Sequence, residues 1–94
     1  MTYKLVFKQD AMKEWEKLDS TIREQFKKKL IERLANPRID SARLNGMKDC
    51  YKIKLRSAGY RLVYQVRDSE ILISVVAVGK RDRNQVYKIA IKRI

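Results

Sequence analysis

The chain has 94 residues, 45% of them hydrophobic, and it carries 23 Lys and Arg against 11 Asp and Glu, a formal net charge of +12. This length suits one domain spanning residues 1–94, the apolar fraction excludes a disordered tail, and the charge favours a polyanionic partner: RNA, DNA, an anionic membrane or an acidic protein segment. With no His and a single Cys the chain excludes an ordinary zinc site and an internal disulfide, and without a long apolar stretch or a signal peptide it is expected in the cytoplasm, not at a membrane.

Residues 2–8 alternate between apolar and polar side chains, which predicts an edge strand with one buried face. Asp10 is a good helix-capping residue, and apolar residues after it recur at helical spacing. The apolar positions of these two elements are Tyr3, Leu5, Phe7, Ala11, Met12, Trp15 and Leu18. We therefore expect a short strand followed by a first helix that ends at residues 19–20.

A second helix is predicted to begin near Thr21. Thr21 and Glu24 have the spacing of a capping box, in which each side chain accepts from the other residue's backbone N–H. Apolar residues then continue at helical period until residues 36–37, Asn-Pro, end the run; they are Ile22, Phe26, Leu30 and Leu34. The two helices are expected to form a hairpin over one face of a sheet.

The second half of the chain has the pattern of a sheet. Residues 38–48 show no sustained period and predict a connector, whereas residues 51–56 and 60–67 alternate as strands around a turn. Residues 71–78 are β-branched and apolar on both faces, which predicts a central strand. A last helix follows residues 79–83, and its apolar side is Val86, Ile89, Ala90, Ile91 and Ile94.

The expected fold is therefore α+β. It has a small, twisted, antiparallel sheet of mostly four strands, with an N-terminal helical hairpin packed on one face and a short C-terminal helix.

The predicted strand hairpin collects cations on one face. An even-numbered turn would put Arg56 opposite Arg61, with the apolar residues of both strands on the other face. The collected cations are Lys52, Lys54, Arg56 and Arg61. Opposed like charges cost up to about 1 kcal/mol, so a surface that keeps them favours an anionic ligand. The alternative is that these side chains only solvate the open face of a half-buried sheet.

Several segments resemble the RelE family of toxins, within the RelE/ParE superfamily. They are residues 15–18 (Trp-Glu-Lys-Leu), 49–57 (Asp-Cys-Tyr-Lys-Ile-Lys-Leu-Arg-Ser), 59–66 (Gly-Tyr-Arg-Leu-Val-Tyr-Gln-Val) and 78–81 (Val-Gly-Lys-Arg). The similarity covers essentially the whole chain and is most specific over residues 50–66 and 79–87. It implies an antiparallel sheet with helices packed against it, in agreement with the pattern of the residues.

The resemblance also implies a function. Family members cut messenger RNA in the A site of the 70S ribosome, where they contact 16S rRNA, and so inhibit translation without a metal or other cofactor. It further implies a cognate RelB-like antitoxin that neutralises the toxin, and operator DNA as a partner only of the toxin–antitoxin complex, which represses its own operon.

Carried over to this sequence, the positions that match the family's catalytic set are Lys52, Lys54, Arg61, Arg81 and Tyr87. Three further residues, Arg56, Lys80 and Arg83, are expected to contact RNA or the ribosome. The alternative for Tyr87 is that it packs against the sheet, as aromatic residues at helical spacing commonly do.

Cleavage of RNA by its own 2′-hydroxyl needs a base, stabilisation of the charged phosphorane and protonation of the departing 5′-oxygen. Since the chain has no His, these roles fall to Lys, Arg or Tyr. Clustered cations lower each other's proton affinity, so Lys52 or Lys54 is a candidate base, with Tyr87 as the alternative. Arg61 and Arg81 suit a phosphate clamp, and Arg81 is also a candidate to assist the leaving oxygen.

Two other functions stay open at this point. The first is a ParE-like toxin on the same scaffold, which binds DNA gyrase and cuts no RNA; the presence of all four cations of the catalytic set favours the ribonuclease instead. The second is a non-catalytic nucleic-acid-binding module, which would read bases with exposed aromatic residues or a groove-binding helix. Against it, Tyr51, Tyr60 and Tyr64 fall on or near the expected core side.

Overall fold

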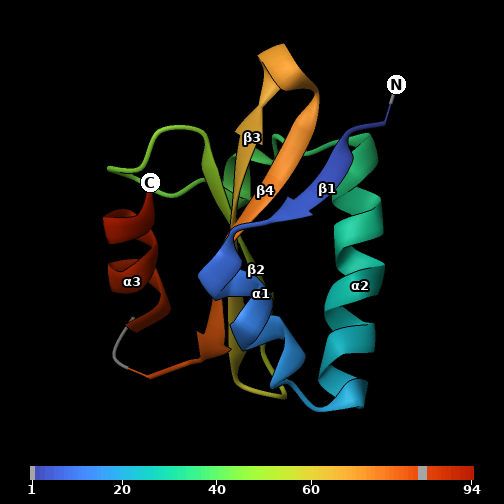
Figure 1. The fold of residues 1–94 in the computed structure, drawn as a ribbon, viewed down its shortest axis with the longest axis vertical. Coiled ribbons are helices and arrows are strands. Elements are labelled where there is room, and N and C mark those ends of the chain that lie inside the picture. Colours follow the sequence, from blue (N-terminus) through green and yellow to red (C-terminus); the bar gives the residue numbers. More distant parts are fainter. Residues whose placement is uncertain (1, 83–84) are drawn as a thin grey trace.

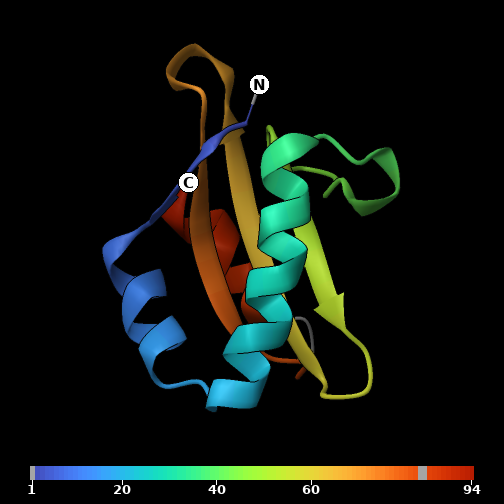
Figure 2. The same ribbon diagram turned by 90° about the vertical axis from the view of Figure 1, so that its right-hand side faces the viewer.

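A computed structural model describes residues 2–82 and 85–94 and has a four-stranded sheet with helices on both faces (Figures 1 and 2). The elements are β1 (Lys4–Phe7), α1 (Gln9–Glu16), α2 (Ser20–Ala35), β2 (Cys50–Leu55), β3 (Tyr60–Arg67), β4 (Leu72–Lys80) and α3 (Gln85–Arg93), with short 3-10 turns at Asp40–Ala42 and Asp68–Glu70. The strand order β1-β4-β3-β2 makes β1 an edge strand and β4 a central one. The α+β class, the edge position of β1 and the central position of β4 are confirmed.

The sheet separates two apolar clusters. The larger lies under α1 and α2, where Phe26 and Leu30 pack on strand residues such as Ile53, Leu62 and Tyr64. The smaller lies under α3 and contains Met47, Cys50, Val63, Val76, Ala77, Val86 and Ala90. Figure 1 shows the resulting layers, with α3 on one side of the sheet and α1 and α2 on the other. The predicted helical hairpin on one face is therefore confirmed.

The sheet is mixed, whereas an antiparallel one was expected. β2, β3 and β4 pair antiparallel, but β1 runs parallel to β4, with Leu5 opposite Ile73. An edge strand with one buried face has the same alternating pattern in either direction. Most of the chain separates β1 from β4 in sequence, so no short turn fixes their relative direction. The local pattern therefore carried no information on the direction of β1.

The register predicted for the β2–β3 hairpin is wrong by two residues. Lys54 lies opposite Arg61 and Leu55 opposite Tyr60, so Arg56 belongs to the connecting turn. The turn is longer than expected because Gly59 adopts a φ of 70°, in the left-handed region, and its N–H donates to the Leu55 carbonyl at 2.8 Å. A shift of two residues leaves every side chain that stays in the strands on its predicted face, whereas Arg56 leaves the sheet, contrary to the prediction.

Both helix-cap predictions are wrong. α1 begins at Gln9 after Lys8, and Asp10 lies inside the first turn. There its negative charge interacts favourably with the positive end of the helix dipole. α2 is capped by Asp19, whose carboxylate accepts from the Thr21 N–H at 3.2 Å, so no capping box starts at Thr21. Two capping residues stand close together here, and the local sequence does not select between them.

The helical stripes are largely as expected, with three exceptions. Phe26, Leu30, Val86 and Ala90 are buried, whereas Met12, Ile91 and Ile94 are 39%, 51% and 44% exposed. The exceptions lie at the margins of short helices, where the apolar stripe is wider than the contact with the sheet. In the part of the chain that the structure describes, no helix has the length and apolar character needed to cross a bilayer.

Arg38 ties together the end of the molecule opposite the β2–β3 turn. It pairs with Asp68 at 2.6 Å and with Asp49 at 3.0 Å, and it donates to the Tyr51 hydroxyl at 3.2 Å. The Tyr3 hydroxyl also donates to Asp68, at 2.6 Å. These bonds join the N-terminal strand, the connector and the β3–β4 turn, and they hold the pKa of Asp68 below its usual range, with Tyr3 as the main cause.

This network predicts an acid-sensitive part of the stability. A carboxyl whose pKa is lowered on folding stabilises the protein above its unfolded pKa, near 3.8, and loses that contribution as the pH falls through the folded value. Asp68→Asn is therefore expected to lower the free energy of unfolding more at pH 7 than at pH 2, as measured by urea denaturation. Asp40→Asn, at an exposed position, is the control. An equal loss at both pH values would show that the charge of Asp68 is unimportant.

Candidate functional site

Three cations of the predicted set share one face of the sheet. Lys54 of β2 lies directly opposite Arg61 of β3, and Lys52 lies two residues earlier on the same face, opposite Val63. We call Lys52, Lys54 and Arg61 the cationic patch. The face is the one covered by α3, since Val63 and Cys50 of the same strand faces pack against that helix.

Gly79 allows α3 to approach this face closely. It lies opposite Arg61 in β4, and a Cβ at this position would come within 3.2 Å of the Val86 side chain. A contact this short is tighter than most, so a larger residue would push the start of α3 outward. The glycine thus allows Tyr87, next in the chain to Val86, to reach Arg61.

Tyr87 and Arg61 form a pair at the margin of the patch. Arg61 Nη1 donates to the Tyr87 hydroxyl at 2.9 Å, and the guanidinium carbon lies 5.7 Å from the centre of the Tyr87 ring. Tyr87 also packs on the smaller apolar cluster, as the packing alternative predicts. A functional role for Tyr87 stays a prediction. The Arg61 Nε–H is buried with no acceptor among the described residues, a cost of about 1–3 kcal/mol of the kind that functional sites tolerate.

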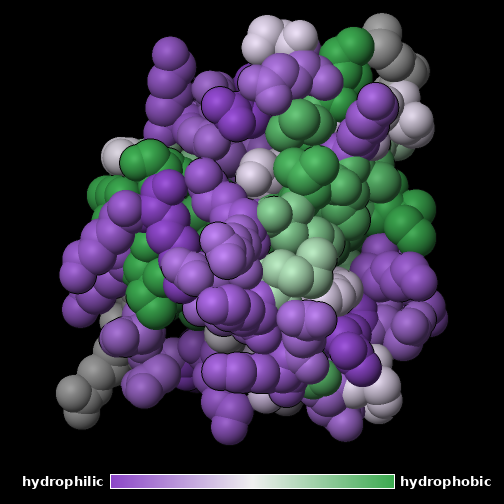
Figure 3. All heavy atoms as spheres, in the orientation of Figure 1, coloured by the Kyte–Doolittle hydropathy of each residue, from purple (hydrophilic) through white to green (hydrophobic). Residues whose placement is uncertain are grey.

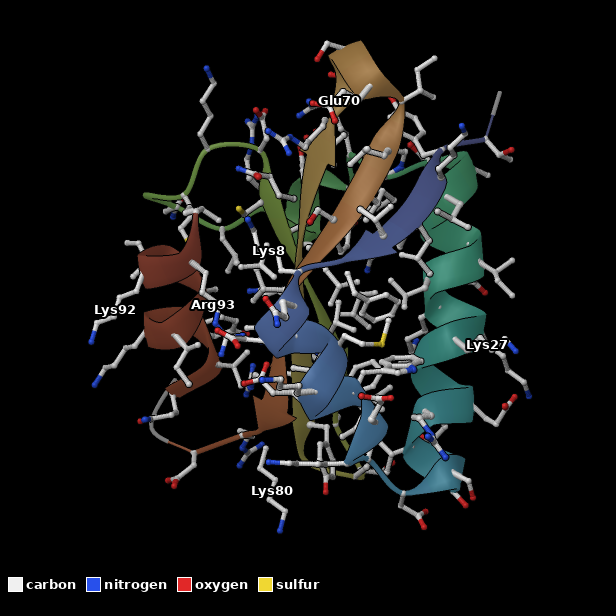
Figure 4. The ribbon with its side chains drawn as sticks, in the orientation of Figure 1. Lys8, Lys27, Glu70, Lys80, Lys92 and Arg93 are labelled. Carbon is white, nitrogen blue, oxygen red and sulfur yellow. The ribbon has the colours of Figure 1, made fainter. Side chains whose placement is uncertain are left out.

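Arg81 lies beside the hairpin turn that ends the patch. Its backbone N–H donates to the Gly59 carbonyl at 2.6 Å, and its side chain is exposed, as is that of Arg56 in the same turn. Lys80 lies opposite Tyr60, so strand alternation directs it to the other face from Arg61 (its place at the lower end of β4 is marked in Figure 4). The prediction for Arg83 falls outside the described residues.

The patch lowers the pKa of one of its members, Lys54. Lys52 is the main cause, and Arg61 the second, of a pKa of Lys54 below the usual value for lysine. The direction follows from Coulomb repulsion, because neighbouring positive charges favour the neutral amine. The lowered pKa makes Lys54 a candidate proton acceptor.

Two residues that support this site were missed by sequence analysis. Arg93 of α3 forms a forked ion pair with Glu14 of α1, with N–O distances of 2.9 and 3.1 Å. Arg93 Nη1 also donates to the Val76 carbonyl at 2.9 Å, and Glu14 accepts from the Val78 N–H at 3.1 Å. The pair joins the two helices across the part of the β4 edge that β1 leaves uncovered (Figure 4 labels Arg93 between α3 and α1). No local pattern could reveal a pair separated by 79 positions.

Breaking this pair is expected to loosen the helix that carries Tyr87. Glu14→Gln keeps an acceptor for the Val78 N–H but removes the charge, which should raise amide exchange in α3 about tenfold or more, since a charged hydrogen bond contributes about 1.5–3 kcal/mol. Exchange measured by NMR, with Glu16→Gln on the exposed side of α1 as control, tests this. Equal protection of α3 in both variants would show that packing alone holds the helix.

The remaining candidate chemistry is limited. Within residues 2–82 and 85–94 no group of three or more His, Cys, Asp and Glu side chains is arranged to hold a metal. Cys50 is buried under α3, and burial raises the pKa of its thiol to about 11, so it is present as the unreactive thiol at neutral pH. The described chemistry is that of cations and a phenol, which bind and stabilise phosphate charge.

Comparison with known proteins agrees with this chemistry. The family model described as "ParE toxin of type II toxin-antitoxin system, parDE" matches residues 5–85. The mRNA interferase toxin RelE of Escherichia coli (strain K12) is 61% identical over 94 residues, which is 100% of this chain and 99% of that protein. A putative RelE-like toxin protein of Escherichia coli is 57% identical with the same coverage.

Solved structures show the same fold. A free-state mutant of E. coli toxin RelE superimposes with a TM-score of 0.92 at 58% identity, covering 100% of this chain and 99% of that one. The toxin chain of the intact E. coli RelBE toxin–antitoxin complex gives a TM-score of 0.83 at 60% identity, covering 86% and 99%. By its fold, its full-length similarity and the match to the family model, this chain belongs to the RelE/ParE family of type II toxins and to the RelE side of it.

Proposed function

We propose that this protein is an endoribonuclease toxin that cuts messenger RNA in the ribosomal A site and thereby inhibits translation. The observation that carries the proposal is the patch of Lys52, Lys54 and Arg61 on one sheet face, with Tyr87 bonded to Arg61 at its margin. The name "mRNA interferase" of a relative that is 61% identical over the whole chain supports the same activity. We further propose that residues 1–94 act as one toxin domain.

The reaction divides among a few side chains. Lys54 takes the proton of the 2′-hydroxyl, because its lowered pKa leaves more of the amine neutral. The 2′-oxygen then attacks the adjacent phosphorus, the bond from phosphorus to the 5′-oxygen breaks, and the products end in a 2′,3′-cyclic phosphate and a 5′-hydroxyl. Arg61 and Arg81 stabilise the charge of the phosphorane, and a proton from Arg81 or from water neutralises the leaving oxygen.

The other residues act through these. Lys52 lowers the proton affinity of Lys54 and adds positive charge beside the phosphate. Tyr87 holds the Arg61 guanidinium through its hydroxyl and offers a ring on which a base can stack. Arg56 and Lys80, exposed at the same end of the sheet, and Arg83 contact RNA or the ribosome.

The absence of a His or Glu base from the cationic patch explains why the proposed activity depends on the ribosome. A lysine ordinarily titrates near pH ~10.4, so at neutral pH less of it is in the base form than of the His or Glu of free-standing nucleases. Such a site works when the substrate is already held in the geometry of attack, which contributes several kcal/mol by itself. The ribosome holds the messenger in the A site and supplies that orientation.

The products give a direct test. Ribosomes programmed with a defined messenger should yield fragments with a 2′,3′-cyclic phosphate and a 5′-hydroxyl when the purified protein is added. Fragments with a 3′-hydroxyl and a 5′-phosphate would require attack by water or metal hydroxide and would contradict the mechanism.

Two further properties belong to the proposal. The protein acts in the cytoplasm, where the ribosomes are. A RelB-like antitoxin neutralises it, as supported by the solved complex of the related E. coli toxin with its antitoxin. The toxin–antitoxin pair represses its own operon by binding operator DNA.

The partner is expected to be recognised by charge. An acidic, amphipathic antitoxin segment should bind this protein of net charge +12 and either cover the cationic patch or displace α3, and so abolish cleavage. Chemical-shift mapping of the complex tests this. Tight binding that leaves both the patch and α3 unchanged would contradict the prediction.

The alternative function is inhibition of DNA gyrase, because the matching family model is described as a ParE toxin. A supercoiling assay separates the two functions, since the proposed ribonuclease leaves gyrase activity unchanged. Inhibition of gyrase without any cut in ribosome-bound messenger would favour the alternative.

A further inference from the structure

A basic pocket lies at the outer edge of β2, beyond the cationic patch. Its volume is about 300 Å³, and it is lined by Arg33, Ser41, Ala42, Lys52, Lys54 and Arg56. Four of these residues are cations, one offers a hydroxyl and none is acidic. Figure 2 shows β2 as the outermost strand, beside α2, so the pocket is at an open margin of the molecule. Its composition suits an anion.

Arg33 is held in place before any ligand arrives. Its Nη1 donates to the Tyr64 hydroxyl at 2.8 Å and to the Lys52 carbonyl at 3.3 Å, and the Tyr64 hydroxyl in turn donates to the Pro37 carbonyl at 2.7 Å. These two bonds use one nitrogen of the guanidinium, whose Nε and Nη2 carry three further N–H donors. A positioned guanidinium loses little conformational entropy when it binds an anion.

The backbone of β2 adds a donor to the same pocket. Asp49 directs its carbonyl to Val66 of β3, and Leu55 directs its carbonyl to Gly59 of the β2–β3 turn. Cys50 and Lys52 direct theirs outward, to Leu44 and Arg33. In an antiparallel strand the N–H and C=O of one residue point to the same side, and the side alternates along the chain. The N–H of Lys54 therefore points outward, to the edge where the pocket lies.

We propose that this pocket binds an RNA phosphodiester next to the one that is cleaved. The inference rests on the proposed function, because Lys52 and Lys54 belong to both the pocket and the cationic patch. A strand whose scissile phosphate lies on the patch has its neighbouring phosphate one nucleotide away, within reach of the same β2 edge. Arg33 and Ser41 are thus assigned to RNA binding, and the group that Arg56 contacts is this neighbouring phosphate.

Direct binding tests the pocket without any cleavage. A short 2′-O-methyl RNA cannot react, since its attacking hydroxyl is blocked, and it serves as the probe. The double variant Arg33→Gln, Arg56→Gln is expected to bind it about tenfold more weakly at low salt. The slope of log affinity against log salt concentration should fall by about 0.7, the change for one lost phosphate contact on a single strand.

The controls separate a lost contact from a damaged fold. Lys27→Gln with Lys28→Gln removes the same two charges from exposed sites roughly 120° and 140° around the axis of α2 from Arg33, and it should leave the slope unchanged. Arg33→Lys keeps the charge and should retain most of the slope. If loss of the Tyr64 and Lys52 bonds unfolds the Arg33→Gln protein, the double variant Ser41→Ala, Arg56→Gln makes the same test away from those bonds.

Ribosomes identify which RNA supplies the phosphate. If it belongs to the messenger, an uncharged methylphosphonate next to the cut should raise KM of the wild type about as much as the Arg33→Gln, Arg56→Gln substitution does, and combining the two should add nothing. If it belongs to ribosomal RNA, the variant should bind ribosomes without messenger more weakly. The first result supports the proposal. The second would overturn it, because a phosphate of ribosomal RNA is not the neighbour of the one that is cleaved.

The outcomes keep this inference apart from the proposed function. Wild-type binding affinity and an unchanged salt slope in a folded double variant would overturn the pocket, even if the protein cleaves normally. A wild-type protein that never cuts messenger on ribosomes would overturn the proposed function, while the 2′-O-methyl RNA measurement would still decide whether the pocket binds phosphate.

Discussion

Replacing both Arg61 and Arg81 with alanine is expected to lower messenger cleavage on programmed ribosomes by about 10³-fold or more while the protein stays folded. Each guanidinium stabilises charge that develops on the phosphorane, and the loss of one such donor typically costs about 10²–10³ in rate. Arg81 is exposed, and Arg61 contributes one hydrogen bond to Tyr87, so the core keeps its packing. Single-turnover cleavage at saturating ribosomes measures the effect on the chemical step.

A control pair removes the same charge elsewhere. Arg43→Ala with Arg67→Ala changes two exposed arginines outside the patch and is expected to alter the rate by less than a factor of about three at moderate salt. Undiminished cleavage by a folded Arg61→Ala, Arg81→Ala protein would remove both residues from the mechanism. A circular dichroism spectrum and an unfolding curve like those of the wild type establish that it is folded.

Lys54 is expected to set the pH dependence of the reaction. Lys54→Met should lower the rate by about 10²–10⁴-fold, the usual contribution of a general base, and flatten the rise of the rate with pH. Lys52→Gln removes the main cause of the lowered pKa of Lys54, so that pKa rises and less neutral amine is present at a given pH. The midpoint of the pH–rate profile should therefore move to higher pH in Lys52→Gln.

The two variants distinguish a base from a mere binding cation. A cation that only holds the phosphate predicts a loss of rate in Lys54→Met with the pH profile unchanged in shape. A midpoint that stays fixed or moves to lower pH in Lys52→Gln would show that Lys54 is not the titrating group. Lys28→Gln, on the exposed face of α2, should leave the profile as in the wild type.

Much of the fold and of the candidate site could be predicted from local patterns. Alternation along residues 51–56 and 60–67 placed Lys52, Lys54 and Arg61 on one face, and this conclusion survived a register error because a shift of two residues preserves the face. Helical periodicity likewise placed Phe26 and Leu30 in the core. These features depend on periods of two and 3.6 residues, which a sequence displays directly.

The rest depends on contacts between distant segments. These contacts are the pairing of β1 with β4, the forked pair of Glu14 with Arg93, and the bonds from Arg33 to Tyr64 and Lys52. Their partners lie between 19 and 79 positions apart in the sequence. No period marks such partners. The start of α2 was missed for a different reason, since adjacent capping residues compete and differ by well under about 1 kcal/mol. The start of α1 was missed because its N-cap, Lys8, makes no side-chain cap bond and so leaves no capping signal in the sequence.

The arrangement suggests how a stable fold tolerates a repulsive surface. Lys54 and Arg61 oppose each other and the Arg61 Nε–H has no acceptor in the described part of the chain, both of which cost stability. Opposite charges are paired elsewhere, where Arg38 joins Asp49 and Asp68. Substitutions in that network are therefore expected to change stability, and substitutions in the patch to change activity.

Toeprinting of a defined messenger on ribosomes, with and without the purified protein, tests the central claim most directly. A new reverse-transcription stop within the A-site codon, dependent on ribosomes and lost in the Arg61→Ala, Arg81→Ala variant, is the predicted result. A messenger left intact in the A site by the folded wild-type protein, or equal cutting of free RNA, would contradict it.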